Sequence, residues 1–299
     1  MFNLSTAIKL VGLIIFSLFI SACGGGGGSG SVTQPPASAS NFLHVKMHYD
    51  LLKNQPFVWG EHEGAPMPIT LSSYVAKGGR ILNVSSTANL KLNQLITYHS
   101  SDGNYYVGKI SALPNTQKII LASALEGPVS SGINAWDFYQ DSTPHPNIYG
   151  FRAVADYTIK SLGFGSQTGG KHVLLGDSWF DERTGESVVS RLRQKLSGAV
   201  LINRGTGGET SQDMLTRFDT DVAPQNPEYV WILAGTNDYW KGLTKAQYKA
   251  NLNTLISKSK AIGAKVIVID CSVGIGTGNT GVPNKQQSDA YANAVLELY

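Results

Sequence analysis

Three short polar blocks carry the residue types that acyl transfer at a serine requires. They are Gly176-Asp177-Ser178-Trp179, Asn203-Arg204-Gly205-Thr206-Gly207-Gly208 and Gly235-Thr236-Asn237-Asp238. Ser178 offers a hydroxyl nucleophile, provided that a base removes its proton. Acyl transfer places negative charge on one oxygen of a tetrahedral intermediate, which preorganised N–H donors stabilise. Gly208 would let a backbone N–H approach closely, and the Asn237 amide is a donor that needs no titration.

Each of these residues also has an ordinary structural interpretation. Ser178 could cap a helix, Gly208 could form a turn, and Asn237-Asp238 could cap a loop. One block alone is a weak signal. Three blocks in this order, each just after a predicted strand, favour an active site.

The elements that must position these blocks follow from hydrophobic periodicity. We expect strands at 171–175, 199–202, 229–233 and 265–269, and helices at 148–162, 187–196, 211–218, 245–262 and 286–298. Continuous apolar strands that alternate with helices predict an α/β fold, with a parallel sheet covered on both faces. The blocks would lie at the carboxyl ends of the strands, where ligands bind in such sheets.

The segment before these elements has a different pattern. β-prone runs at 94–99 and 105–110 flank the Asp-Gly turn signal of 100–104, which predicts a hairpin. Further strands are expected at 118–122 and 81–84. We therefore predict a small β-rich module over 41–135, whose chemistry the sequence does not reveal.

The blocks resemble those of the SGNH (GDSL-type) hydrolase family, over about residues 145–299. The resemblance implies a flavodoxin-like, three-layer domain with a parallel sheet. It implies Ser178 as the nucleophile, with an oxyanion hole made by the backbone N–H groups of Ser178 and Gly208 and the side-chain amide of Asn237. It also implies that no metal or organic cofactor is needed.

The family's histidine follows an aspartate in a block near the C-terminus, but this chain has no histidine after His172. The stretch 141–151 (DSTPHPNIYGF) resembles that block, yet it precedes the serine block. The sequence therefore predicts a circularly permuted SGNH domain over 136–299, with His145 as general base. The family's aspartate lies three residues before its histidine, where this chain has Ser142. We assign Asp141 as the acid that orients His145.

Other interpretations of the titratable residues stay open. Asp137 is a second choice for the orienting acid, and a backbone carbonyl could orient the imidazole instead. His172 lies within a predicted strand and is expected to be structural. His62, between Glu61 and Glu63, could suggest a metal site, but no second cluster supports one.

The N-terminal residues have the pattern of a targeting segment. Residues 1–22 combine Lys9, an apolar run over 10–20 and small residues, which is typical of a signal peptide. Ile20-Ser21-Ala22-Cys23 resembles the lipobox of bacterial lipoproteins, which implies a lipid on Cys23; an ordinary secretory signal is the alternative. Residues 23–40 would form a flexible tether rich in Gly, Ser and Pro. Gly24 after the cysteine suggests the outer membrane of a Gram-negative bacterium.

Composition excludes several classes of protein. The 299 residues hold 24 Lys and Arg against 21 Asp and Glu, a net charge of +3 without a long basic run, which argues against a nucleic-acid binder. Only Cys23 and Cys271 are present, so neither a disulfide-rich scaffold nor a Cys-based zinc site is expected. If Cys23 is acylated, Cys271 is an unpaired core residue.

The sequence therefore predicts an envelope-anchored serine esterase that acts on small-molecule or glycan esters, acetyl esters among them. An acyltransferase on an envelope glycan is one alternative. A non-catalytic surface lipoprotein that uses the SGNH body as a binding scaffold is another. Trp179, Tyr239 and Trp240 could line the substrate cleft or could be packing residues.

Overall fold

The computed structural model describes residues 42–47, 66–138, 145–183, 187–270 and 285–299. The predicted signal peptide (1–22), the tether (23–40) with Cys23, and the residues His62, Asp141 and Cys271 lie outside the described residues. Among the helices described, none is both long enough and apolar enough to cross a membrane.

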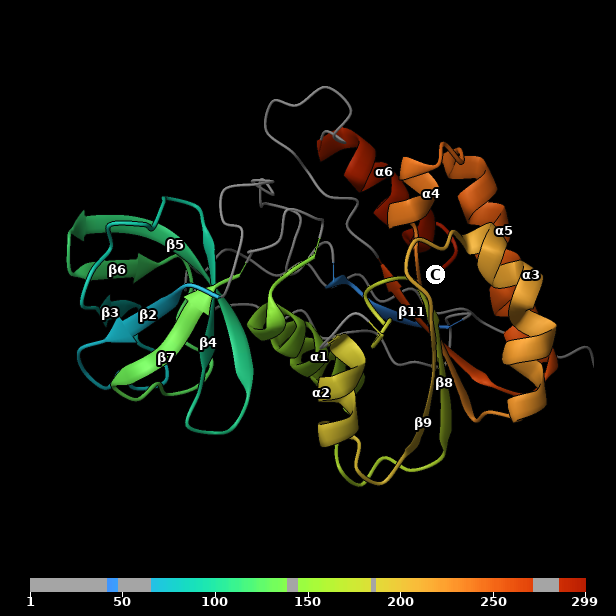
Figure 1. The fold of residues 1–299 in the computed structure, drawn as a ribbon, viewed down its shortest axis with the longest axis horizontal. Coiled ribbons are helices and arrows are strands. Elements are labelled where there is room, and N and C mark those ends of the chain that lie inside the picture. The colour runs from blue at the N-terminus through green and yellow to red at the C-terminus, as the bar shows by residue number, and fades with distance from the viewer. Residues whose placement is uncertain (1–41, 48–65, 139–144, 184–186, 271–284) are drawn as a thin grey trace, which may run out of the picture. The chain divides into compact units, whose positions relative to one another are not determined.

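A parallel sheet of five strands forms the centre of the α/β part (Figure 1). Its order is β1 (Leu43–Val45), β11 (Lys265–Asp270), β10 (Tyr229–Ala234), β8 (Lys171–Gly176) and β9 (Val200–Gly205). Side chains alternate between the two faces along each strand, as on β8, where Leu174 packs into one core and Val173 and Leu175 pack into the other. The continuous apolar runs thus reflect a sheet that is buried on both faces.

Helices cover each face of this sheet. One face packs against α1 (Ile148–Leu162) and α2 (Val188–Lys195). The other face packs against α3 (Ser211–Asp221), α5 (Lys245–Ala261) and α6 (Lys285–Leu296). The predicted α/β class is confirmed, and each predicted helix is present near its expected bounds. The sequence analysis missed the short helix α4 (Thr236–Trp240).

An antiparallel sheet forms the second part of the described chain. Its order is β2 (Pro68–Leu71), β7 (Gly132–Asp137), β4 (Leu95–His99), β5 (Tyr105–Asn115), β6 (Lys118–Leu121) and β3 (Ile81–Asn83). The predicted hairpin is β4 and β5, with His99 paired to Tyr105. The outer strands are also linked, because Ser72 N donates to Asn83 O at 2.8 Å and Ser85 N donates to Thr70 O at 2.9 Å. We call residues 66–138 the β module; it has its own apolar core.

The predicted start of the β-rich module at residue 41 is wrong. β1 pairs in parallel with β11, with Leu43 opposite Ile267 and Val45 opposite Ile269, so it belongs to the other sheet. The predicted end at 135 also falls inside β7, which continues to Asp137. A strand of three residues has too short a pattern to reveal its partner, and only its hydrogen bonds to β11 do so.

Buried charged groups join the β module to α1 and α2, within one compact unit. Asp156 on α1 accepts from the backbone N of Tyr105 at 2.7 Å and from Arg191 Nε at 2.9 Å. Arg191 Nη2 also donates to Gly103 O, at 2.7 Å. Both charged side chains are nearly inaccessible, so the β4–β5 turn is fastened to the helices by satisfied polar groups.

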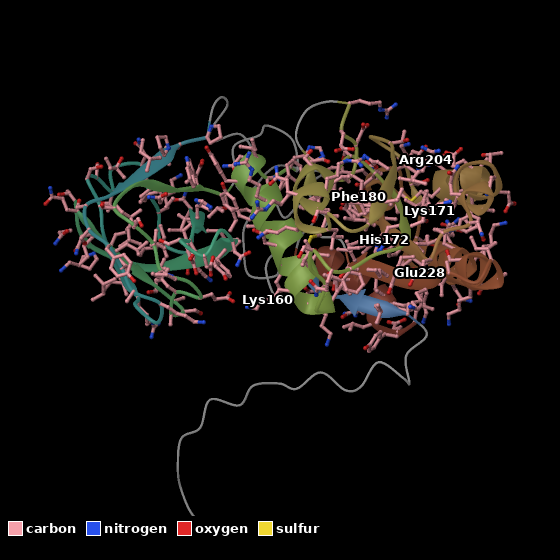
Figure 2. The ribbon with its side chains drawn as sticks, turned by 90° about the horizontal axis from the view of Figure 1, so that it is seen from below. Lys160, Lys171, His172, Phe180, Arg204 and Glu228 are labelled. Carbon is pink, nitrogen blue, oxygen red and sulfur yellow. The ribbon has the colours of Figure 1, made fainter. Side chains whose placement is uncertain are left out.

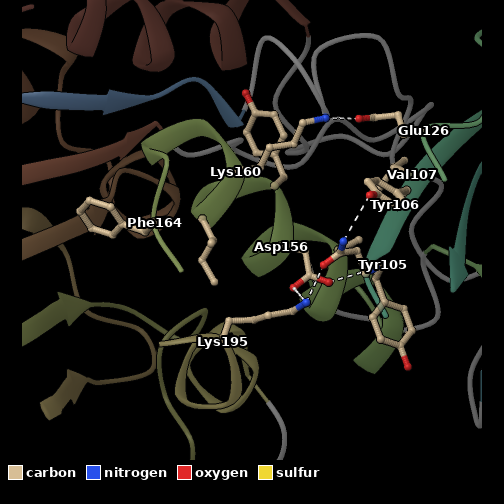
Figure 3. A pocket seen from close by; sticks show the side chains of 12 residues that line it. Tyr105, Tyr106, Val107, Glu126, Asp156, Lys160, Phe164 and Lys195 are labelled. Carbon is tan, nitrogen blue, oxygen red and sulfur yellow. Dashed lines mark hydrogen bonds and ion pairs between the residues drawn. The ribbon is translucent and has the colours of Figure 1, made fainter. Parts of the chain in front are cut away.

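A cavity of about 330 Å³ lies beside this junction, between β5 and α1 (Figure 3). Its charged side chains are paired with one another, Lys160 with Glu126 and Lys195 with Asp156. Neither Ser178 nor His145 is among the residues that line it. The cavity is therefore a feature of the junction.

Candidate active site

The three polar blocks meet at one edge of the parallel sheet. Gly176, the last residue of β8, pairs with Gly205 of β9 and with Leu233 of β10, so the three strands end at one level. Since the first two blocks contain these positions and the third begins two residues after Leu233, the chain leaves all three strands at the same edge.

Ser178 lies in hydrogen-bonding contact with His145. His145 Nε2 is 2.6 Å from Ser178 Oγ, although 33 positions separate the two residues. This distance suits a hydroxyl that donates to an unprotonated imidazole nitrogen, the arrangement that a general base needs. The His145 ring lies 6.4 Å from the Trp179 ring and 6.3 Å from the Phe151 ring, between centroids.

The predicted acid of the triad is Asp141, and Asp137 is the second choice. Asp141 lies outside the described residues and stays a prediction. Asp137, the second choice, is fully buried at the end of β7. Its Oδ1 accepts from Met67 N and from Asn147 Nδ2, each at 3.1 Å.

Glycines allow the second block to pass close to the serine turn. A Cβ on Gly205 would lie 2.5 Å from the carbonyl carbon of Phe180, and one on Gly207 would lie 3.8 Å from Ser178 Cβ. Gly208 has a φ of 79°, in the left-handed region that favours glycine. A side chain at Gly205 would therefore collide with Phe180, whereas a Cβ on Gly207 would make only ordinary contact with Ser178.

A carboxylate that sequence reasoning missed holds this loop. Asp181 Oδ2 accepts from Gly207 N at 2.8 Å. Arg183 donates to the same carboxylate through Nε at 2.9 Å and Nη2 at 2.7 Å, and these hydrogen bonds keep the pKa of Asp181 well below its ordinary value. Asp181 therefore bridges the serine turn to the loop that contains Gly208. Its place after Trp179 and Phe180 carries no recognisable signal of this role.

The short helix α4 positions Asn237. Its Nδ2 donates to Glu209 O at 3.0 Å and to Asp177 Oδ2 at 3.3 Å, so the first block and the residue after the second block orient the amide. The next residue, Asp238, is fully buried and accepts from Ser211 N at 3.0 Å. The third block is thereby fixed to the start of α3.

Burial shapes the electrostatics of the site. Asp177 is fully buried, and desolvation raises its pKa to about 7, although the hydrogen bond from Trp179 N favours the charged form. Burial likewise raises the pKa of Asp238. Two carboxyl groups beside the predicted oxyanion hole therefore bind protons more readily than exposed aspartates do.

The aromatic residues near the blocks divide into two groups. Trp179 is 1% exposed and packs edge-on against Phe151, so it is a core residue. Trp240 is 43% exposed and lies edge-on to Tyr239. Of these three rings, Trp240 is the most exposed, and Tyr239 is partly buried.

Two further histidines are held by neighbours in the core. Trp231 Nε1 lies 3.0 Å from His172 Nδ1, and His172 Nε2 lies 2.9 Å from Gly169 O; His172 is labelled in Figure 2. An indole N–H only donates, so Nδ1 accepts and Nε2 carries the proton. His44 on β1 lies 3.1 Å from Asp270 at the end of β11, with both side chains buried. This second pair was missed because it depends on the pairing of β1 with β11.

Comparison with known proteins points to one family. The model of the GDSL-like lipase/acylhydrolase family matches residues 169–299. An uncharacterized lipoprotein of Bacillus subtilis, YqeF, is 38% identical over 77 residues, which are 24% of this chain and 32% of that protein. An acetylxylan esterase of Geobacillus stearothermophilus is 29% identical over 111 residues, or 34% of this chain and 50% of the relative.

One more relative and one solved structure extend the comparison. Esterase TesA of Pseudomonas aeruginosa is 35% identical over 90 residues, which are 29% of this chain and 45% of that protein. A crystal structure of the Geobacillus acetylxylan esterase is 25% identical, with a TM-score of 0.36, over 43% of this chain and 71% of that one. The chain thus spans between 32% and 50% of the length of these curated relatives. Residues 169–299, which match the model of the GDSL-like lipase/acylhydrolase family, contain all three polar blocks.

Proposed function

We propose that this protein is a serine esterase, with Ser178 as nucleophile and His145 as general base. The observation that supports this most directly is the 2.6 Å distance between Ser178 Oγ and His145 Nε2, at the sheet edge where the three blocks meet. The esterases among the relatives support the same reaction class.

The reaction follows from this geometry. His145 Nε2 takes the proton of Ser178 while Oγ bonds to the ester carbonyl carbon. The resulting oxyanion is stabilised by the N–H groups of Ser178 and Gly208 and by Asn237 Nδ2. The intermediate then collapses, the bond to the alcohol oxygen breaks, and His145 protonates the departing alkoxide. Water, deprotonated by His145, then bonds to the acyl carbon, the bond from that carbon to Ser178 Oγ breaks, and His145 returns the proton to Oγ, so that a carboxylic acid leaves. In this proposal Asp141 orients the imidazole.

Acetylated glycans are the substrate class that we propose. One relative is named for acetylxylan, and the exposed ring of Trp240 follows Asn237 closely in α4. An exposed indole face suits the apolar face of a sugar ring.

We further propose that the catalytic domain is circularly permuted. Two observations support the proposal: β1 occupies the sheet position beside β11, and the histidine segment precedes the serine block in the chain yet lies against it. New termini of this kind are tolerated when they fall on the surface.

A lipid anchor on Cys23 in the cell envelope, at the outer membrane of a Gram-negative bacterium, completes the proposal. The lipobox-like sequence and a relative named as a lipoprotein support it. Fractionation of cells that express the chain and its Cys23→Ser variant tests it, because only the wild type should partition with membranes.

Hydrolysis of p-nitrophenyl acetate by the purified full chain tests the esterase. Ser178→Ala and His145→Ala should each lower kcat by about 10³-fold or more, since nucleophile and base act as a unit. Ser101→Ala, on the β4–β5 turn, is the matched control and should keep the wild-type rate. Wild-type activity in Ser178→Ala would contradict the proposal.

A further inference from the structure

The β module and α1 bracket the segment that carries His145. β7, the last strand of the module, ends at Asp137, and α1 begins at Ile148. His145 lies between them, so the position of its imidazole depends on how β7 and α1 are held relative to each other.

A buried carboxylate of the module fastens the two sides of this segment. Asn147 Nδ2 donates to Asp137 Oδ1 at 3.1 Å and also to the Asp137 carbonyl. Asn147 N donates to Phe138 O at 3.2 Å. Asp137 is fully buried and Asn147 is 7% exposed, so water does not compete for these hydrogen bonds.

The same asparagine caps α1. Its Oδ1 accepts from Gly150 N at 2.9 Å, which fixes the side chain while its amide faces Asp137. The side chain of Asn147 therefore has two separable functions, a cap for the helix and a clamp to the module.

A second contact, between the residue before Asp137 and the second residue after Asn147, reinforces the clamp. Trp136 on β7 stacks on Tyr149 in the first turn of α1, with ring centroids 3.7 Å apart and planes 13° apart. The approach is so close that a Cβ on Gly150 would lie 3.0 Å from Phe138 O. The end of β7 and the start of α1 are thus held against each other by stacking as well as by hydrogen bonds.

We propose that Asp137 is a positioning residue for His145, acting through Asn147, and that the β module serves the active site by supplying it. This inference rests on the proposed function, because it concerns the base of that reaction. A displaced base slows the chemical step while substrate binding is unaffected, since a misplacement of about 1 Å can cost about 100-fold in rate.

Three variants of the full chain test the proposal. Asp137→Ala removes the carboxylate acceptor and leaves the backbone carbonyl of residue 137 in place. Asn147→Ser keeps a side-chain oxygen that caps α1 but removes the amide donor. Each should lower kcat for p-nitrophenyl acetate about 10- to 100-fold, with KM within about twofold of wild type. The double variant should be no slower than the slower single variant, because both changes break one contact.

The control is Thr244→Ala, which removes the cap of α5, where Thr244 Oγ1 accepts from Gln247 N at 3.2 Å. It should lower the melting temperature and leave kcat unchanged. If Asp137→Ala does not fold, Asn147→Ser carries the test. Values of kcat within about twofold of wild type in both clamp variants would overturn the inference. Ser178→Ala in the same assay separates the outcomes: if it is inactive while the clamp variants are normal, the inference alone fails, and if it is active, the proposed function fails.

Discussion

At the scale of single residues, the orientation of Asn237 is the most informative feature of the site. Its amide has two acceptors, Glu209 O at 3.0 Å and Asp177 Oδ2 at 3.3 Å. The longer contact is the one that an oxyanion could replace, while the shorter one keeps the side chain in place. Because burial raises the pKa of Asp177 to about 7, its carboxyl is partly protonated near neutral pH and competes less strongly for the amide.

Asn237→Ala should therefore lower kcat for an acetyl ester by about 10²- to 10³-fold, the usual cost of one oxyanion donor. KM should change little, because the interaction strengthens only in the transition state. Steady-state kinetics checks this against Asn134→Ala, a partly buried residue of the β module. A change in KM with kcat intact would mean that Asn237 only binds substrate.

Asp181→Ala tests whether the loop of the second block needs its carboxylate. Without the acceptor for Gly207 N, the neighbouring N–H of Gly208 loses its fixed direction, and we expect kcat to fall about 10-fold or more. Asp219→Ala, which removes an exposed carboxylate paired with Lys258, is the control. Equal rates in the two variants would show that the loop keeps its geometry without Asp181.

At the scale of elements, His172 shows how the central strands are held together. It lies on β8, stacks on Tyr229 with centroids 4.4 Å apart, and accepts from the indole of Trp231, both on β10. Burial lowers the pKa of His172 below the ordinary value of 6.5. A proton on Nδ1 would also face the indole N–H of Trp231, which only donates. The neutral imidazole is therefore the form that the fold accepts.

This predicts a pH dependence of stability. Because the pKa of His172 is lower in the folded state, its contribution is complete above about pH 6.5 and is lost as the pH falls below that value. The loss is at most about 1.4 kcal/mol per pH unit. Urea unfolding between pH 7.5 and 5.5 should give a smaller decrease in the free energy of unfolding for His172→Phe than for wild type. Equal decreases in the free energy of unfolding for the two proteins would rule out this contribution of His172.

At the scale of the whole molecule, the β module is joined to the α/β part by buried polar contacts. Asp156 and Arg191 pair at 2.8 Å with about a tenth or less of either side chain exposed, and both also bond the β4–β5 turn. Removal of one partner of such a pair lowers the stability of the fold strongly, because the charge of the other partner stays buried.

Two arginines of α2 give a matched test. Arg191→Leu should lower the free energy of unfolding by about 3 kcal/mol or more, because it leaves the Asp156 carboxylate buried. Arg193→Leu, whose partner Glu182 is partly exposed, should cost less than about 1 kcal/mol. Chemical unfolding compares the two, and similar losses would mean that burial of the Asp156 pair adds nothing.

Local patterns were sufficient to predict much of the fold and part of the site. The helix predicted over 148–162 is α1, because the spacing of Phe151, Ala155 and Ile159 creates its buried face. The hairpin of β4 and β5 follows from β-prone runs around Asp102-Gly103. Ser178, Gly208 and Asn237 could be singled out because each follows a strand whose apolar run is visible in the sequence.

Tertiary structure decided what depends on residues far apart in the chain. β1 has three residues, so its place beside β11, and with it the contact of His44 with Asp270, follows from pairing and not from any local period. Asp181 acts by accepting a hydrogen bond from Gly207, and Asp137 acts by accepting one from Asn147. No local pattern in the sequence predicts either contact. The sequence by itself determined most of the segments that form strands and helices, because periodicity is a relation between neighbours. Only the packed structure determined that His145 lies 2.6 Å from Ser178, because that distance depends on how those elements are held together.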